Sequence, residues 1–267
     1  MDRCVIETSR EMTPKTILLD LLGVAFPKPV LSQHLWVISD IFSVPENSLR
    51  VALTRLVAKG WVSNDVRGEY HLSEKARARN TFIRNWKGKG KQKAWRERWL
   101  ACHLPKGSGR TERAKSIKAL EWYGFKPGLD LMWVRPDNLS LSKTELQNAL
   151  RLLGLEANAH VFVLDEVETS LVDNWLQLWP IQQMDSTYIA LTKQLQNSAK
   201  KPEQKRSLLE TCLLGGEAIH YLVKDPQLPE EIHGRQHYDA LRETMENYDQ
   251  MGRTIWFSEL ANLGVSS

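Results

Sequence analysis

The sequence is poor in cysteine and has no long apolar run. Its three cysteines, Cys4, Cys102 and Cys212, lie far apart and form no CxxC pair. This spacing excludes a disulfide framework and favours a reducing compartment. The longest apolar stretch, residues 17–26, is interrupted by Asp20 and is too short to span a bilayer. An apolar signal-peptide core is also missing near the N-terminus. We therefore expect a cytoplasmic protein with no membrane contact.

Motifs that mark common enzymes are missing as well. The sequence has no GxSxG nucleophile elbow, no HExxH zinc motif and no GxxxxGK[ST] phosphate loop. His233 and His237 are four residues apart, with Cys212 and His220 upstream, but no motif of metal ligands accompanies them. We interpret them as surface histidines beside an acidic helix. We expect no metal, no cofactor and no enzymatic activity.

Charge is distributed unevenly, although the formal net charge is only +4. Residues 75–118 hold fifteen lysines and arginines against two acidic residues, whereas residues 225–249 hold seven acidic residues against two arginines. This asymmetry favours a polyanionic partner for one part of the molecule. The alternative is a solvated helix face followed by a flexible linker. The ten tryptophans are ascribed to packing.

Residues 1–74 are predicted to form a winged helix-turn-helix domain. Apolar periodicity and turn residues indicate helices at about 14–26, 31–42 and 45–59, and strands at 61–64 and 69–72. A capping box of Ser43 and Glu46 is expected to begin the third helix, and Gly60 to end it. Its buried stripe is expected to consist of Leu49, Ala52, Leu53, Leu56 and Val57.

The rest of the chain is predicted to form a linker, a sheet domain and a helical domain. Residues 75–93 combine a basic helix with KGKGKQK, which is typical of a linker. Residues 94–168 alternate strand, helix, strand, strand, helix and strand, the ferredoxin-like arrangement. Residues 169–267 show helical patterns alone. The fold class expected is therefore α+β multidomain, with a C-terminal α-helical domain.

The third helix carries the candidate DNA-binding residues. On the face opposite its apolar stripe, four side chains would fit a major groove, where Arg takes guanine and Asn takes adenine bidentately: Asn47, Arg50, Val51 and Thr54. Candidate contacts to phosphates, or through the hairpin, lie beside them: Ser48, Arg55, Lys59, Arg67 and Tyr70. The alternative is a polar face with no partner, or a face that binds another protein.

Five segments occur in an order and spacing that resemble a known family: NSLRVALTRLVAKGWV, YHLSEKAR, WRERWLACHLP, ALEWYGFKPGLDLMWVRPDNL and LVKDPQLPEE. They resemble the PaaX family of bacterial transcriptional regulators, the repressors of phenylacetate catabolism and their relatives. The resemblance extends from about Lys15 to Tyr248, and its strongest parts are the helix–Gly–Trp–wing segment, RPDNL at 135–139 and DPQLPEE at 225–231.

This resemblance implies a dimeric repressor that binds inverted repeats near promoters and is released by an aryl-CoA thioester such as phenylacetyl-CoA. It also implies the three domains named above, and it aligns Arg50 and Arg55 with the recognition-helix arginines. The sequence departs from the family pattern at PGLDLMW, LLGGEAIH and the IHG after DPQLPEE. Residues for an effector are therefore not assigned.

The function expected is therefore a repressor that binds operator DNA and leaves it when an acyl- or aryl-CoA effector binds. Two alternatives to this function stay open. One is a winged-helix module that binds DNA or protein without a small-molecule effector. The other is a metal-dependent nuclease built on the ferredoxin-like domain. Such nucleases need a carboxylate at the end of the first strand, where this sequence has Cys102, His103, Leu104 and Pro105. That reading is therefore disfavoured.

Overall fold

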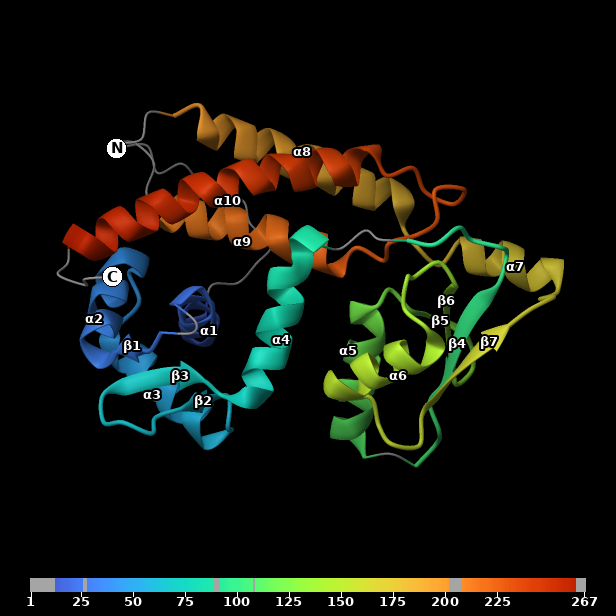
Figure 1. Cartoon of the computed structure of the whole chain (residues 1–267), viewed down its shortest axis with the longest axis horizontal. Coiled ribbons are helices and arrows are strands. Elements are labelled where there is room, and N and C mark those ends of the chain that lie inside the picture. The colour runs from blue at the N-terminus through green and yellow to red at the C-terminus, as the bar shows by residue number, and fades with distance from the viewer. Residues whose placement is uncertain (1–12, 26–27, 89–91, 108, 202–207, 263–267) are drawn as a thin grey trace. The chain divides into compact units, whose positions relative to one another are not determined.

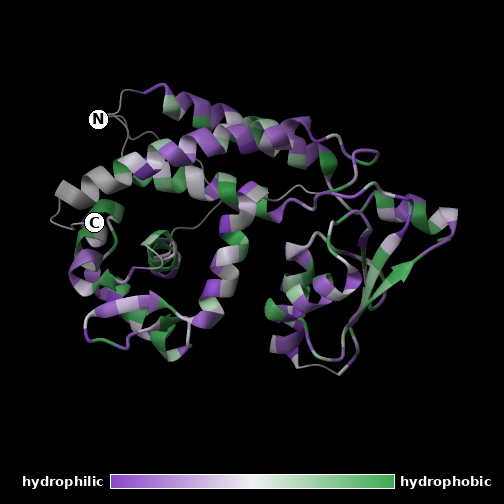
Figure 2. Cartoon of the chain, viewed as in Figure 1, coloured by the Kyte–Doolittle hydropathy of each residue, from purple (hydrophilic) through white to green (hydrophobic). Residues whose placement is uncertain are grey.

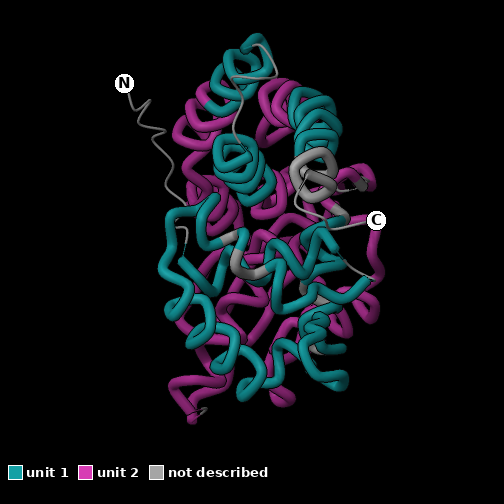
Figure 3. Tube along the Cα trace, turned by 90° about the vertical axis from the view of Figure 1, so that its left-hand side faces the viewer, with its two compact units in different colours: residues 1–84, 191–220, 243–267 teal, residues 85–190, 221–242 magenta. Residues whose placement is uncertain are grey.

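The computed structural model describes residues 13–25, 28–88, 92–107, 109–201 and 208–262. It is an α+β structure with two antiparallel sheets (Figure 1). The chain packs as two compact units, which Figure 3 distinguishes by colour. Unit 1 consists of residues 1–84, 191–220 and 243–267, and unit 2 of residues 85–190 and 221–242. The division into four segments expected from the sequence, with boundaries after residues 74, 93 and 168, stays a prediction.

The first part of unit 1 is a set of helices packed on a small sheet. The helices are α1 (Pro14–Ala25), α2 (Ser32–Phe42), α3 (Glu46–Ala58) and α4 (Glu74–Arg84), and the strands are β1 (Val30–Leu31), β2 (Val62–Ser63) and β3 (Glu69–Leu72). The strands are antiparallel in the order β1-β3-β2. Apolar side chains from α1, α3 and all three strands share one core. The helices and the hairpin were predicted, but the two-residue β1 was not.

Two local expectations for α3 are wrong. Pro45, not Ser43, is the N-cap of α3, and no side chain caps this end. Ser43 instead ends α2 in the left-handed conformation, with φ 51°. Val57, expected in the buried stripe, is 37% exposed. It follows Leu56, which completes the stripe of three leucines that face the core, and so lies at the edge of the buried face.

A four-stranded antiparallel sheet forms the centre of unit 2. Its strands are β4 (Trp99–His103), β5 (Lys126–Leu129), β6 (Met132–Pro136) and β7 (His160–Leu164), and a short 3-10 helix, η1 (Asn85–Gly88), precedes them. The strand order is β5-β6-β4-β7. Helices α5 (Arg110–Trp122) and α6 (Lys143–Leu152) connect β4 to β5 and β6 to β7. The succession of strands and helices along the chain is the predicted one.

The two faces of this sheet carry separate cores, because alternate residues of a strand point to opposite sides. Leu100 and Cys102 of β4 pack in a core with residues of α5 and α6. Trp99 of β4 belongs to the other core. Its ring centroid lies 5.1 Å from that of Trp175 and 6.3 Å from that of Trp179. These tryptophans therefore pack the interior, as predicted.

Four helices follow β7 in the described part of the chain. They are α7 (Thr169–Leu176), α8 (Ile181–Ala199), α9 (Leu208–Lys224) and α10 (Gln236–Asn262). The last three each have residues in both units. Figure 2 shows both polar and apolar residues along α8 and α10. The buried residues of α8 recur at helical spacing, which indicates one buried face: Tyr188, Leu191, Leu195 and Ser198. Within the described residues no strand follows β7, and no helix is long and apolar enough to cross a membrane.

Candidate nucleic-acid interface

Helix α3 presents a strip of exposed side chains on the side opposite its core. Leu49, Leu53 and Leu56 are 1%, 6% and 2% exposed and attach the helix to the core of unit 1. The structure brings the four predicted base-reading residues together on the accessible side: Asn47, Arg50, Val51 and Thr54 are all exposed. The strip is therefore accessible over two turns of the helix.

Arg50 is held along the helix surface by Glu46, which was predicted to form a capping box with Ser43. Its Nε and Nη2 both donate to Glu46 Oε1, at 2.9 and 2.5 Å. Thr54 Oγ1 in turn donates to Arg50 O at 3.0 Å. The spacing of four residues between Glu46 and Arg50 is a signal in the sequence that could have revealed this pair.

The flanking candidates differ in accessibility. Arg55 and Lys59 are exposed at the C-terminal end of α3, and Arg67 is exposed in the turn between β2 and β3. Ser48 is partly buried. Tyr70 is also partly buried and packs against the core of unit 1. The ring of Tyr70 therefore contributes to packing, whereas the three cations are available for contacts outside the chain.

The basic run of residues 75–118 is not one uniform positive surface. Several of its described cations bind groups of the protein, among them Arg77 to Leu72 O, Arg84 to Gly23 O, Lys93 and Arg98 to Asp137, and Arg113 to Pro105 O. Arg77 and Arg84 belong to unit 1, whereas Lys93, Arg98 and Arg113 belong to unit 2. Part of the run thus stabilises the fold, and a count of its charges overstates the positive surface.

The segments RPDNL and DPQLPEE meet in the interior of unit 2. Arg135 is 1% exposed, and its Nη2 donates to Asn138 Oδ1 at 2.8 Å and to Gln227 O at 3.4 Å. Asn138 Nδ2 donates to the same Gln227 O at 2.7 Å. Arg135 Nε donates to Pro136 O, and its Nη1 donates to Tyr123 O. One guanidinium therefore joins β6, the end of α5 and the segment that follows α9.

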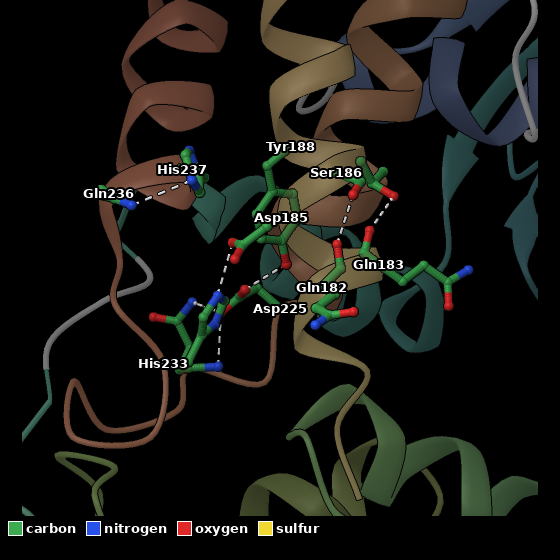
Figure 4. A network of polar contacts seen from close by, with 11 residues as sticks. Gln182, Gln183, Asp185, Ser186, Tyr188, Asp225, His233, Gln236 and His237 are labelled. Carbon is green, nitrogen blue, oxygen red and sulfur yellow. Dashed lines mark hydrogen bonds and ion pairs between the residues drawn. The ribbon is translucent and has the colours of Figure 1, made fainter. Parts of the chain in front are cut away.

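Asp225, the first residue of DPQLPEE, binds Gln227 of the same segment and Tyr188 of α8. Its Oδ1 accepts from Gln227 N at 2.8 Å and from Gln227 Nε2 at 2.7 Å, and its Oδ2 accepts from Tyr188 Oη at 2.6 Å (Figure 4). These bonds hold Gln227 at φ 54°, a left-handed conformation that is unfavourable for a residue with a Cβ. Two of the three strongest segments of the family resemblance therefore lie mostly buried in the fold of unit 2.

The charge of Arg135 survives this burial. Burial lowers the pKa of Arg135 to about 9, while the carboxylates of Asp137 and Asp225 act to raise it. The guanidinium is therefore still protonated at neutral pH. A buried charge of this kind needs its hydrogen-bond acceptors, because removing them leaves the charge without compensation.

The expectation of surface histidines is wrong for His233. This side chain is 9% exposed, and its Nε2 lies 2.9 Å from Asp185 Oδ1 of α8 (Figure 4). The cause is a tight turn in which His233 N donates to Pro229 O, so that the segment folds back on α8. His237 is partly buried and contacts Gln236. Among the described residues, no group of three or more His, Cys, Asp or Glu side chains is placed to hold a metal ion.

Cys102 and His103 are the last two residues of β4, the place where a nuclease of the ferredoxin-like type would need a carboxylate. Cys102 is buried, and burial raises the pKa of its thiol to about 12. The thiol is therefore protonated at neutral pH and is a poor nucleophile. His103 is exposed.

No protein-family model matches the sequence, and no curated protein matches it. Among solved structures, the chain is similar to the uncharacterized protein Rv0674 from Mycobacterium tuberculosis. The two share 21% sequence identity with a TM-score of 0.56, over 92% of this chain and all of that one. This likeness concerns the fold alone.

Proposed function

We propose that this chain is a sequence-specific, DNA-binding transcriptional regulator. In this proposal the first part of unit 1 is a winged helix-turn-helix, and the sheet of unit 2 with α5 and α6 is ferredoxin-like. The observation that carries the proposal is α3, whose leucines are buried and whose opposite strip is exposed from Asn47 to Thr54. The hairpin β2–β3, with Arg67 exposed in its turn, supports it.

The proposed binding mode follows from the types of residue on α3. The helix enters the major groove, and Arg50 and Asn47 take guanine and adenine edges. Arg55 and Lys59, exposed beside the strip, neutralise phosphates, as does Arg67 in the hairpin turn. Because each neutralised phosphate releases counterions, the affinity falls steeply as salt rises.

The regulatory part of the proposal rests on the resemblance to the PaaX family. It makes the protein a cytoplasmic homodimer that represses transcription from an operator with an inverted repeat. An acyl- or aryl-CoA effector then favours a dimer geometry in which the two recognition helices no longer match the half-site spacing.

Fluorescence anisotropy tests this proposal. The full chain is titrated into labelled duplex DNA from its own upstream region and into random duplex, with and without a panel of acyl- and aryl-CoA thioesters. Tight binding to the upstream DNA that one thioester abolishes is the expected result. Equal affinity for both duplexes contradicts the DNA-reading function, whereas specific binding that no thioester changes contradicts the effector alone.

The second candidate is an interaction module without an effector. It is favoured by two exposed apolar side chains on α3, Val51 and Val57, which are 42% and 37% exposed. Such side chains are suited to a protein partner as well as to a thymine methyl group. A change in DNA affinity on adding a thioester separates the regulator from a module without an effector, and a preference for one DNA sequence separates a module that binds DNA from one that binds protein.

A further inference from the structure

Glu46 and Arg50 form a bonded pair at the start of the exposed strip of α3. Glu46 is the first residue of α3, and one of its carboxylate oxygens, Oε1, accepts from both Nε and Nη2 of Arg50. The side chains of Arg50 and Glu46 are 59% and 46% exposed. An exposed pair of this kind contributes little to folding stability, because water screens both charges. Its geometry, however, restricts where the guanidinium points.

The guanidinium is a planar fork with five N–H donors in fixed directions. The two bonds to Glu46 use the Nε side of this fork. Bidentate contact with guanine O6 and N7 needs two parallel donors, which the Nη1 and Nη2 edge of the same fork presents. Because the bonds to Glu46 hold the Nε side of Arg50, they also set the direction of its Nη1–Nη2 edge, the edge that can donate to guanine.

The position of the pair on the helix matches this use. Recognition helices contact base edges chiefly through residues of their N-terminal part. Glu46, Arg50 and Thr54 follow one another at intervals of four residues and so form one row, in which Thr54 Oγ1 donates to Arg50 O. Arg50 and Thr54 of this row belong to the strip that the proposed function brings into the major groove, and Glu46 lies directly before it.

We propose that Glu46 is a positioning residue, which aims Arg50 at a guanine and makes α3 require a G·C pair at that place. The inference rests on the DNA-binding function proposed above. Glu46 also repels phosphates, so it weakens binding to arbitrary DNA while it directs Arg50 to a base. Specificity then arises from attraction at the correct site and repulsion elsewhere.

Selection from a pool of random-sequence duplexes, followed by sequencing of the bound fraction, tests the role of Glu46. The full chain is compared with Glu46→Gln, Arg50→Ala and the double variant. Arg50→Ala is expected to lose one G·C preference by about 5- to 150-fold. Glu46→Gln is expected to weaken the same preference by about 2- to 5-fold, the fold-change that corresponds to the free energy of an exposed charge pair. In the Arg50→Ala background, Glu46→Gln is expected to change no base preference.

Glu74→Gln is the matched control, because Glu74 is also exposed and also the first residue of a helix in unit 1, α4. Both single Glu variants are expected to bind random DNA more tightly and to unfold at similar temperatures, but Glu74→Gln keeps the G·C preference. An unchanged preference in Glu46→Gln overturns the role of Glu46 alone. A loss that also occurs in the Arg50→Ala background overturns it as well, since Glu46 would then act independently of Arg50. A wild-type protein without any base preference overturns the proposed function and this inference together.

Discussion

Replacement of Arg135 by methionine removes the buried guanidinium of unit 2 and puts a shorter, unbranched, uncharged side chain in its place. Arg135 is 1% exposed and donates to four acceptors: Pro136 O, Tyr123 O, Asn138 Oδ1 and Gln227 O. Gln227 O retains the bond from Asn138 Nδ2, but Tyr123 O loses the donor from Arg135. Asp225 loses the nearby positive charge and stays buried at 6% exposure.

The expected cost follows from these losses. Removing one partner from a buried charged network costs about 3–5 kcal/mol, because the remaining polar groups stay buried without compensation. For a unit of this size, each kcal/mol lowers the melting temperature by about 3 °C, so unit 2 is expected to unfold roughly 10–15 °C earlier. Lysine at this position is expected to rescue little, because a point charge cannot reach acceptors in three directions.

Thermal and urea unfolding followed by circular dichroism measure this cost. Arg151→Met is the matched control, since Arg151 also donates to three carbonyls, those of Glu156, Ala157 and Ala159, but is only partly buried. Water replaces its bonds, and a loss of at most about 1 kcal/mol is expected. Equal losses in the two variants would refute the reasoning that the buried position of Arg135 makes it structural.

Three further predictions concern single residues. Gly124→Ala is expected to destabilise unit 2 by roughly 2–4 kcal/mol in urea unfolding, because Gly124 has φ +74° and a Cβ would lie 2.6 Å from Pro226 Cα; a neutral result would contradict the close packing. Cys102 is expected to resist iodoacetamide in the folded protein at neutral pH, as measured by mass spectrometry. Its raised pKa also means that the folded state loses stability as pH rises through about 9 toward 12, since the unfolded thiol ionises first; rapid alkylation at neutral pH would contradict its burial. Arg67→Ala is expected to weaken binding to all DNA equally and to lower the salt slope by about one unit, and a loss confined to one base position would contradict a phosphate role.

Periodic patterns in the sequence were sufficient to predict most elements of the fold. The helices α1–α6 and the strands of the larger sheet lie where apolar spacing and turn residues placed them. The prediction of a capping box at Ser43 and Glu46 was wrong for a physical reason. SVPE at 43–46 and SKTE at 142–145 share one pattern, but only the second forms a capping box. Ser43 follows directly on α2 and must turn left-handed, whereas Ser142 has the extended conformation that an N-cap needs.

Contacts between distant segments could not be predicted from spacing alone. Arg135 and Gln227 lie 92 positions apart, and nothing in either segment indicates that they meet in the interior of unit 2. The charge count of residues 75–118 misled for a similar reason, since it could not show which cations bind carbonyls or Asp137. The exposed strip of α3 was predictable, because a single helix fixes which side chains share a face.

Methylation interference on the DNA upstream of this gene tests the central claim most directly, namely that α3 reads bases in the major groove. Guanine N7 lies in the major groove and adenine N3 in the minor groove. Methylation of specific guanines at N7 is predicted to block the wild-type protein, and at least one of these guanines is predicted to lose its effect with Arg50→Ala. Interference from adenine N3 alone, or from no base at all, would contradict the account.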